Sequence, residues 1–366
     1  MKLGVASAVV GGRRVYGDVE IADGAVTAVG VTPPGRKGIA TAGFVDLQVN
    51  GFGGVDFLDT DEAGYEKAGR ALARTGVTAY QPTFITSPES DVLAALDVAA
   101  QLPEAPGGPR ILGVHLEGPF ISPKWPGAHN PDNIIPPGLE LAQRLCERGP
   151  VTYMTIAPEG DGALDLLDWL RSRGIVVSLG HCDADATIAH AAFDRGARAI
   201  THIFNAQRRW SARDPGVAGV ALARNDVVVT AIADFVHLGR ETVMATWRAT
   251  QGRFVVVTDA IMAAGLPSGS YTLGDRSVVV EDGAARLPDG TLAGSVATMD
   301  GALRNLVSLG IPLEDAVLAM TTVPAGAIER PELGHLEPGS PADVVVLDDS
   351  LNVIRTLVDG REAFVS

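Results

Sequence analysis

The sequence predicts an α/β protein: a (β/α)8 TIM-like barrel with a small β-sandwich built from both chain ends. Two observations lead to this prediction. Apolar runs alternate with amphipathic helical segments through the middle of the 366-residue chain. Short alternating strands separated by Gly and Asp occupy both ends. The predicted domains are residues 1–40 together with 338–366, which form the sandwich, and residues 41–337, which form the barrel.

Each chain end carries too few strands for a stable sheet of its own. Residues 14–21 and 25–30 alternate between apolar and polar positions, and residues 342–348 and 353–360 repeat the style near the C-terminus. A stable sheet needs about three strands with a shared apolar face. We therefore expect the two ends to join.

The middle of the chain holds eight apolar runs that suit parallel strands covered on both faces. The predicted strands are Gly43–Asn50, Val77–Phe84, Ile111–Glu117, Thr152–Ala157, Ile175–His181, Ala199–Phe204, Val227–Ala233 and Phe254–Asp259. Amphipathic segments such as Gly162–Arg173 and Asp185–Asp194 predict the intervening helices. Residues Leu266–Leu292 predict a hairpin inserted after the eighth strand.

Composition and charge exclude several classes of protein. Hydrophobic residues make up 46% and charged residues 20%, which is typical of a globular protein with a large core. The net charge of −15 disfavours nucleic acid and anionic membranes as partners, although a pocket can still be locally basic. We expect no membrane span and no signal peptide. Two cysteines, Cys146 and Cys182, could form at most one disulfide, which is too few to stabilise a chain of this length. A reducing compartment is the simpler interpretation, so we expect a cytoplasmic protein.

Residues that can bind a metal stand where four predicted strands end. Glu117, His181 and Asp259 end the third, fifth and eighth strands, and His202 lies in the sixth. Active sites of (β/α)8 barrels lie at this end of the strands, and a buried ionisable group is costly unless it is paired or metal-bound. We predict that Glu117, His181 and His202 bind a metal, which leaves a fourth position for water.

Asp259 is the predicted general base and acid, which takes a proton from the water and returns it to the leaving amine. The metal would lower the pKa of the water towards about 7 and polarise the carbonyl under attack. Each residue alone has a plainer interpretation as a structural histidine, an ion-paired glutamate or a helix-capping aspartate. Four such residues on four strands favour the joint interpretation. His190 and His335 are interpreted as structural or solvent-facing.

Motifs in order over nearly the whole chain resemble the N-acetylglucosamine-6-phosphate deacetylase family of the amidohydrolase superfamily. The matching stretches are residues 43–51 (GFVDLQVNG), 115–120 (HLEGPF), 127–131 (GAHNP), 180–181 (GH), 201–206 (THIFNA), 214–216 (DPG), 257–260 (VTDA) and 292–295 (LAGS). The resemblance implies metal-dependent hydrolysis of the acetamide of N-acetyl-D-glucosamine 6-phosphate to D-glucosamine 6-phosphate and acetate. It places the metal on Glu117, His181 and His202 and the proton transfer on Asp259.

The first strand suggests how many metal ions are bound. Many members of the superfamily hold a second metal with a His-X-His pair there, whereas this chain has Gln48, Val49 and Asn50. Carboxamides are poor ligands compared with imidazole, so we predict one divalent metal per subunit. Zn²⁺ fits the ligand set, and Fe²⁺, Co²⁺ and Mn²⁺ are alternatives.

The resemblance also implies contacts with the substrate, a small amino sugar phosphate. These are Ala128, His129, Asn205, Ala206, Arg213, His237, Leu292, Ala293 and Gly294. Arg213 would bind the phosphate with its planar fork of donors, although its residue context alone favours an ion pair with Asp214. His237 would reach the ligand of the neighbouring subunit, so a homodimer is expected.

Three segments of the substrate region depart from the family pattern. They are Trp125-Pro126, the loop Gln207–Trp210, and Phe235, which replaces a small residue. These departures keep alternatives open: another N-acetyl amino sugar (the galacto epimer or an unphosphorylated sugar), or a different N-acyl compound. A non-catalytic sugar-phosphate-binding barrel is disfavoured because the three predicted metal ligands and the predicted base are all present. A two-metal cyclic-amide hydrolase is disfavoured because the His-X-His pair of the first strand is missing.

Overall fold

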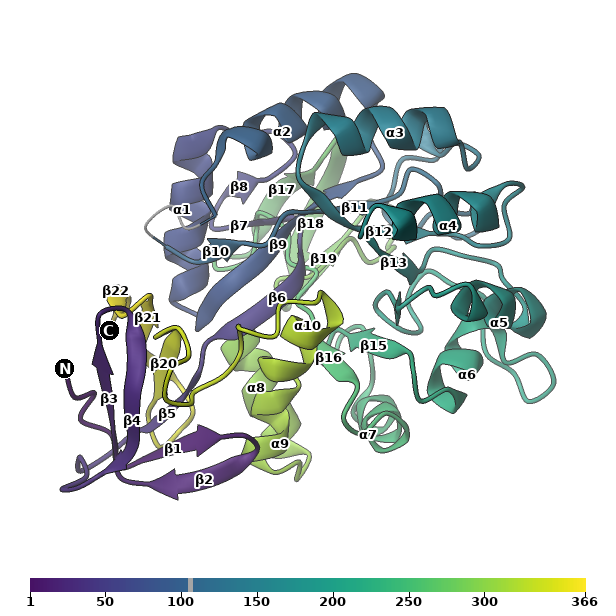
Figure 1. The fold of residues 1–366 in the computed structure, drawn as a ribbon. Coiled ribbons are helices and arrows are strands. Elements are labelled where there is room, and N and C mark those ends of the chain that lie inside the picture. The colour runs from purple at the N-terminus through teal and green to yellow at the C-terminus, as the bar shows by residue number, and fades with distance from the viewer. Residues whose placement is uncertain (105–107) are drawn as a thin grey trace.

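Eight parallel strands form a barrel in the computed structural model of the protein, which describes residues 1–104 and 108–366 (Figure 1). They are β6 (Phe44–Val49), β9 (Val77–Ile85), β11 (Val114–Glu117), β12 (Val151–Ile156), β13 (Val176–Leu179), β14 (Ala199–Ile200), β15 (Val228–Ala231) and β16 (Phe254–Val256). Neighbouring strands pair in this order. The ring closes just beyond β16, where the Asn50 N–H donates to the carbonyl oxygen of Ala260 at 2.8 Å. The predicted fold class is confirmed.

Helices surround the barrel and share one hydrophobic core with its strands. They are α1 (Glu62–Ala73), α2 (Glu89–Gln101), α3 (Leu139–Arg148), α4 (Ala163–Ser172), α5 (Ala186–Asp194), α6 (Gly216–Ala223), α7 (Arg240–Ala249), α8 (Met299–Ser308), α9 (Leu313–Leu318) and α10 (Thr322–Ala327). Each early helix fills the connection between two barrel strands. In α4, Leu166, Leu167 and Leu170 are buried against the barrel, while Asp165 stays in solvent. This one-sided pattern is what made the helices recognisable in the sequence.

The two chain ends form a separate β-sandwich, and both termini lie there (Figure 1). The larger sheet has the order β2 (Arg13–Tyr16), β1 (Ser7–Val10), β5 (Ile39–Ala42), β20 (Val344–Leu347), β21 (Val353–Val358) and β22 (Arg361–Val365). The hairpin of β3 (Asp18–Ala22) and β4 (Ala25–Val31) packs on it through a shared apolar core. The central strand β5 pairs with β1 in parallel and with β20 antiparallel, so neither end completes the sheet alone.

An inserted three-stranded sheet follows the last barrel strand, where the sequence predicts a hairpin. Its strands are β17 (Gly269–Leu273), β18 (Arg276–Glu281) and β19 (Ala284–Arg286). Its first turn is fastened to two loops at the carboxyl end of the barrel. The Gly274 N–H donates to Asp56 Oδ2 at 3.0 Å, and Asn130 Nδ2 donates to Asp275 Oδ2 at 2.6 Å. Asp56 belongs to a small hairpin of β7 (Gly51–Phe52) and β8 (Val55–Asp56).

Several strands are shorter than predicted, and most of the differences lie at the carboxyl end of the barrel. The predicted strand Ala199–Phe204 is regular only over β14, because His202 and Phe204 adopt left-handed conformations with φ of 26° and 71°. The predicted strand Ile111–Glu117 is divided into β10 (Arg110–Ile111) and β11 by Gly113, whose φ is 81°. Apolar periodicity does not reveal such turns, because it reports burial and not backbone conformation.

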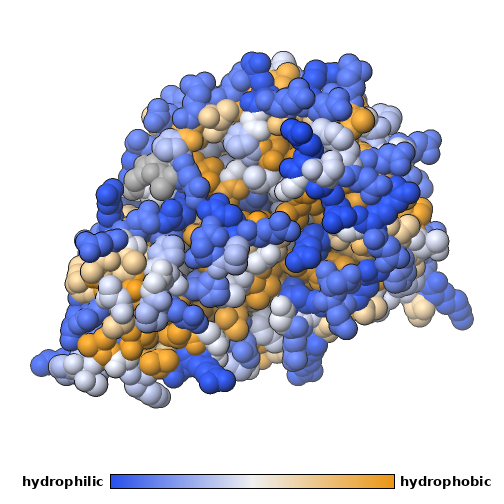
Figure 2. Space-filling view, viewed as in Figure 1, coloured by the Kyte–Doolittle hydropathy of each residue, from blue (hydrophilic) through white to orange (hydrophobic). Residues whose placement is uncertain are grey.

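Hydrophilic side chains cover most of the face shown in Figure 2, and hydrophobic ones gather over the strands of the chain ends. No helix among residues 1–104 and 108–366 is long and apolar enough to cross a membrane.

Candidate active site

A cavity of about 420 Å³ opens at the carboxyl ends of the barrel strands. Its volume lies within the roughly 300–1,000 Å³ typical of small-molecule sites. Most of the predicted site residues line it: Glu117, Ala128, His129, His181, His202, Asn205, Ala206, His237, Asp259, Leu292 and Gly294. Two do not: Ala293 is buried in the core of the inserted sheet, and Arg213 is exposed.

The predicted ligand atoms converge on one point of this cavity. Glu117 Oε1 lies 2.8 Å from His202 Nε2 and 3.3 Å from His181 Nε2, and the two imidazole nitrogens are 3.2 Å apart. All three side chains are buried. Three electron-rich atoms this close in a dry site need a proton or a cation between them. The set also matches the nitrogen and oxygen ligands that divalent metals prefer.

Hydrogen bonds to the other ring nitrogens distinguish metal ligands from donors. His181 Nδ1 lies 2.9 Å from the carbonyl oxygen of Trp125, so it carries the proton and leaves the Nε2 lone pair free. His129 Nδ1 accepts the Thr86 N–H at 3.2 Å, so in the neutral ring Nε2 carries the proton. Burial lowers the pKa of His129 to about 4, which keeps that ring neutral.

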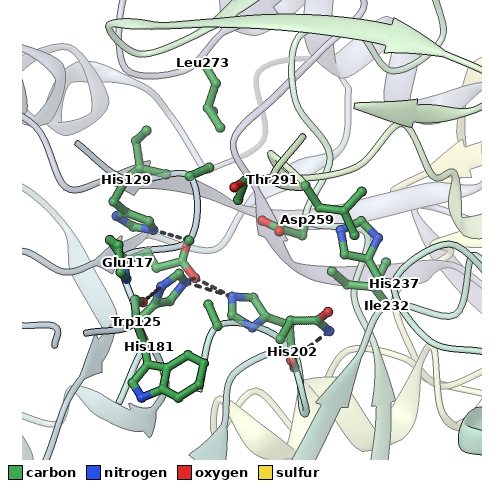
Figure 3. A pocket seen from close by; sticks show the side chains of 18 of the residues that line it. Glu117, Trp125, His129, His181, His202, Ile232, His237, Asp259, Leu273 and Thr291 are labelled. Carbon is green, nitrogen blue, oxygen red and sulfur yellow. Dashed lines mark hydrogen bonds and ion pairs between the residues drawn. The ribbon is translucent and has the colours of Figure 1, made fainter. Parts of the chain in front are cut away.

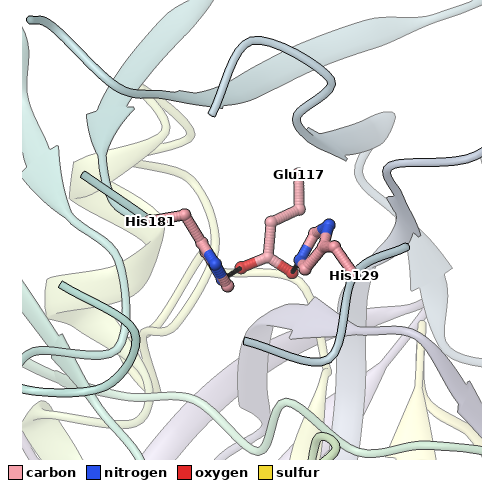
Figure 4. A group of neighbouring side chains, drawn as sticks. All are labelled: Glu117, His129 and His181. Carbon is pink, nitrogen blue, oxygen red and sulfur yellow. Dashed lines mark ion pairs between the residues drawn. The ribbon is translucent and has the colours of Figure 1, made fainter. Parts of the chain in front are cut away.

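Glu117, His129 and His181 form a compact group in which each carboxylate oxygen faces one ring (Figure 4). His129 Nε2 approaches Glu117 Oε2 at 3.6 Å, on the side away from His202. Because its Nε2 holds a proton, His129 supports Glu117 as a donor and is a poorer ligand than His202. By distance alone Glu117, His129 and His181 can hold a metal ion, and the proton on His129 Nε2 is the reason to keep His202 in the predicted set.

The charge of Glu117 is stabilised by its neighbours. Burial by itself would raise its pKa, but the contacts with His129, His181 and His202 outweigh that effect and hold the pKa well below the usual value. His202 is affected in the opposite sense. Burial opposes its charge, yet the contact with Glu117 raises the pKa of the imidazole. The Glu117 side chain is thus anionic at neutral pH.

Asp259 lies across the cavity from Glu117, on the same side as His237, with His202 between (Figure 3). Its Oδ1 accepts hydrogen bonds from Asn50 Nδ2 at 2.7 Å and from Gln48 Nε2 at 3.1 Å. Burial, reinforced by the nearby charge of Glu117, raises the pKa of Asp259 to about 6. A carboxyl group with such a pKa can both take up and release a proton near neutrality.

The backbone places these groups by leaving the strand conformation. His181, His202 and Asp259 have φ values of 46°, 26° and 51°, a region that residues other than glycine rarely adopt. Such positions cost free energy and cluster at functional sites. Gly127 allows the covering loop to approach, since a Cβ there would lie 3.0 Å from His181 Cε1. The resulting turns aim both rings and the carboxylate into the cavity.

His237 lines the cavity of its own chain, and its predicted reach to the ligand of a neighbouring subunit stays a prediction. Its Nδ1 lies 2.7 Å from Asp234 Oδ2, and Asp234 Oδ1 accepts the N–H groups of Val236 and His237 at 2.8 Å. Burial opposes the charge of Asp234, but these contacts outweigh it and lower the pKa of the carboxyl. Asp234 therefore fixes the His237 ring, with Nε2 as its free nitrogen. Phe235, at φ of 66°, lies under the Arg240 guanidinium and not in the cavity lining.

Arg213 makes no ion pair with any described residue. The ion pair with Asp214 that its residue context alone favours is therefore absent. Asp214 pairs with Arg208, whose Nε donates to Asp214 Oδ2 at 2.8 Å. Arg208 Nη1 also donates to the carbonyl oxygen of Asp183 at 3.2 Å. The loop 207–210 is thereby tied down, while Arg213 points its charge to solvent.

The sequence analysis missed Asp183, which joins two of the departures from the family pattern. Its Oδ1 accepts from Trp125 Nε1 at 2.9 Å, and its Oδ2 accepts from Lys124 Nζ at 2.7 Å. Arg208 contacts the same carboxylate at 3.5 Å. Lys124 and Trp125 line the cavity, so Asp183 organises its rim. The available signal was its position two residues after His181, at the end of a barrel strand.

Comparison with known proteins agrees with this geometry. The sequence matches the amidohydrolase family over residues 39–363. A human protein named N-acetylglucosamine-6-phosphate deacetylase is 39% identical over 343 residues, which cover 88% of this chain and 83% of the human one. A protein of Escherichia coli named N-acetylgalactosamine-6-phosphate deacetylase is 34% identical over 357 residues, which cover 94% of each chain.

A solved structure is similar over the whole chain. It is a mutant N-acetyl-D-glucosamine-6-phosphate deacetylase from Mycobacterium smegmatis in complex with N-acetyl-D-glucosamine-6-phosphate. The TM-score is 0.94 at 32% identity, and the match covers 100% of this chain and 99% of the other.

Proposed function

Because the chain belongs to the amidohydrolase family, and within it to the N-acetylglucosamine-6-phosphate deacetylases, we propose that it hydrolyses the acetamide of N-acetyl-D-glucosamine 6-phosphate. The products are D-glucosamine 6-phosphate and acetate. One observation carries the proposal beyond the family. Glu117 Oε1, His181 Nε2 and His202 Nε2 meet within 3.3 Å of one another, opposite a buried Asp259.

We propose that these three atoms hold one divalent ion per subunit, with Zn²⁺ as the first candidate. Fe²⁺, Co²⁺ and Mn²⁺ accept the same ligands. When bound, the ion polarises the acetamide carbonyl and makes water a better nucleophile near neutral pH. Gln48 and Asn50 support a single ion, because each donates an N–H to a carboxylate and so offers no lone pair there.

Asp259 accepts the proton that the attacking water releases and then returns it to the departing amine. Its raised pKa, about 6, suits both steps, because the group must exchange a proton within each turnover. Glu117 stays anionic throughout, since its pKa is held well below the usual value. His129 keeps one oxygen of Glu117 in place and excludes water beside it.

The substrate binds between the metal ligands and the outer rim of the cavity. We assign the sugar to the segments around Ala128, Asn205 and Leu292, and the phosphate to the end that contains His237. Asp234 supports this assignment because it holds Nδ1 of His237 and directs Nε2 towards the cavity.

We propose a homodimer in which Arg213 of the second copy reaches the phosphate. Arg213 matches a phosphate-binding position of the family, yet it is exposed and does not line the cavity of its own chain. This placement leaves the Arg213 guanidinium available to a phosphate in the cavity of a second copy. Arg208 is unsuited to the role, because Asp183 and Asp214 already hold its guanidinium.

The cytoplasm is the proposed location. Cys146 and Cys182 are both free thiols, which suits a reducing compartment.

Acetate release from N-acetylglucosamine 6-phosphate tests the proposed function. The protein would be assayed with and without prior removal of metal, beside the unphosphorylated sugar. We expect release from the phosphorylated sugar only, its loss on metal removal, and its return when Zn²⁺ is added back. Equal release from both sugars would reject the phosphate assignment. No release from either sugar, in protein that holds one metal ion, would reject the substrate.

The galacto epimer is a second candidate, because the Escherichia coli relative named for it matches 94% of both chains. Parallel kcat/KM values for the two epimers decide between them. A higher value for the gluco epimer supports the main proposal, and a higher value for the galacto epimer replaces its substrate while keeping the same reaction.

A further inference from the structure

Two carboxamides connect the catalytic carboxylate to the metal-ligand carboxylate. Gln48 Nε2 lies 2.9 Å from Glu117 Oε1 and 3.1 Å from Asp259 Oδ1. Asn50 Nδ2 lies 2.7 Å from the same oxygen of Asp259. A carboxylate oxygen only accepts, so each amide must present its NH₂ group, and this fixes the orientation of both side chains.

The side-chain hydrogen bonds that Asp259 receives from the described residues all end on Oδ1. An oxygen that already accepts two N–H groups is the poorer proton acceptor, because its lone pairs are engaged. We infer that Gln48 and Asn50 are positioning residues: they hold Oδ1 of Asp259 and leave Oδ2 as the oxygen that takes and returns the proton. The inference rests on the proposed deacetylation and goes beyond it by assigning these two residues and this oxygen.

Gln48 also fixes the spacing between the metal site and the base. One NH₂ group reaches both carboxylates, so each hydrogen serves one of them. A backbone hydrogen bond also fixes the position of Asp259 relative to Gln48, since the Asp259 N–H donates to the carbonyl oxygen of Gln48 at 2.9 Å. Rotation of the Asp259 carboxylate would break both amide contacts. A base held in this way meets water at one distance and direction in every turnover.

A purely structural role explains the arrangement less well. Asn50 is 3% exposed and lines the cavity, yet its Oδ1 has no hydrogen-bond partner within the described part of the chain. A buried amide with an unsatisfied oxygen lowers stability, so packing alone would favour an apolar side chain. The hydrogen bond from Asn50 to Asp259 explains why an amide, and not an apolar side chain, stands at this position.

Isosteric apolar substitutions test the inference. Gln48→Met and Asn50→Leu keep the side-chain volume and remove the N–H donors. We expect kcat to fall roughly 10- to 100-fold, the cost of a misplaced catalytic group. KM should change by less than about threefold, because ground-state binding is untouched. Metal content should stay near one ion per chain in Asn50→Leu, since Asn50 contacts no ligand.

Gln81→Met is the matched control. Gln81 is fully buried in the neighbouring strand β9, but its Nε2 donates to Thr152 Oγ1 at 2.9 Å and not to either carboxylate. We expect near wild-type kcat from this variant. An equal loss of kcat in Gln81→Met would overturn the inference, because any buried Gln-to-Met change would then have the same effect. Unchanged kcat in both test variants would overturn it as well.

A crystal structure of Asn50→Leu gives a second measurement that does not depend on turnover. A rotated Asp259 carboxylate supports the inference, and an unmoved one overturns it. If Asn50→Leu fails to fold, Asn50→Ala, which also removes the donor, replaces it in both measurements. Failure of the proposed function is distinguishable, since the wild-type protein would then release no acetate from either hexosamine phosphate.

Discussion

The inner and outer ends of the cavity are built differently. At the inner end, Glu117, His181 and Asp259 project from strand ends, are buried, and are each fixed by hydrogen bonds to neighbouring elements. At the outer end, Trp125 and Arg208 stand on loops joined through Asp183 near the surface. The inner end holds the residues that match the family pattern, and the outer end holds the departures. Rigid strand ends thus set the reaction, while loops set the choice of substrate.

The largest expected effect lies at the inner end. Asp259→Ala should reduce kcat about 10³-fold or more, because one residue performs both proton transfers. Metal content should remain near one ion per chain, because Asp259 is not a ligand. Steady-state kinetics and elemental analysis of the same sample check this. A variant with near-normal kcat would refute the assignment of the base.

The second prediction separates ligand from support within the inner end. His202→Ala should lose its metal on gel filtration, since a ligand nitrogen is gone. His129→Ala should retain it, with affinity weakened by roughly 10- to 100-fold, as is usual for residues that only orient a ligand. Elemental analysis of both variants decides the matter. The reverse ranking would replace His202 by His129 in the ligand set.

The third prediction concerns the outer end and the proposed dimer. Arg213→Ala and Asp259→Ala should each be poorly active alone at low substrate concentration. Mixing and reassociation should restore about a quarter of the wild-type rate, because half of the dimers then contain one complete site. A coupled acetate assay on the mixture measures it. No recovery, with subunit exchange shown by mass spectrometry of a tagged copy, would place Arg213 outside the neighbouring site.

A smaller effect is expected at the proposed phosphate end of the cavity, where Asp234 holds His237. Asp234→Asn should raise KM for the phosphorylated sugar about tenfold, equivalent to about 1.4 kcal/mol, because His237 loses its anionic partner. The value of kcat should fall less. Asp194→Asn, on the surface of α5, serves as the control and should leave KM unchanged. A loss equal in size on the unphosphorylated sugar would show that Asp234 maintains the fold and not phosphate binding.

The smallest effect concerns stability in the outer loop. Gln207 is 3% exposed, and both of its amide atoms lack a hydrogen-bond partner among the residues described. Gln207→Met removes this unsatisfied amide at similar volume, so the free energy of unfolding should rise by about 1–2 kcal/mol. Denaturant titration measures the change. A decrease would indicate that the amide binds an ordered water or a ligand group.

The comparison of sequence with structure follows the same division. The alternation of apolar runs and amphipathic segments predicts the barrel, because burial on both faces of a parallel sheet imposes that pattern on the residues themselves. Polar residues at four strand ends predict the metal ligands and the base for the same reason. The predicted strand Ala199–Phe204 was too long, since burial alone does not report the left-handed turn at His202.

The sequence by itself therefore determined the fold class and led to the expected residues of the reaction and the expected single metal ion, because these depend on residue type and spacing. Only the tertiary structure decided which nitrogen of His181 is free, how Asp234 orients the His237 ring, and which oxygen of Asp259 is held by Gln48 and Asn50. These depend on hydrogen bonds between residues far apart in the chain, such as the 211 positions between Gln48 and Asp259. Their geometry exists only once the barrel has closed.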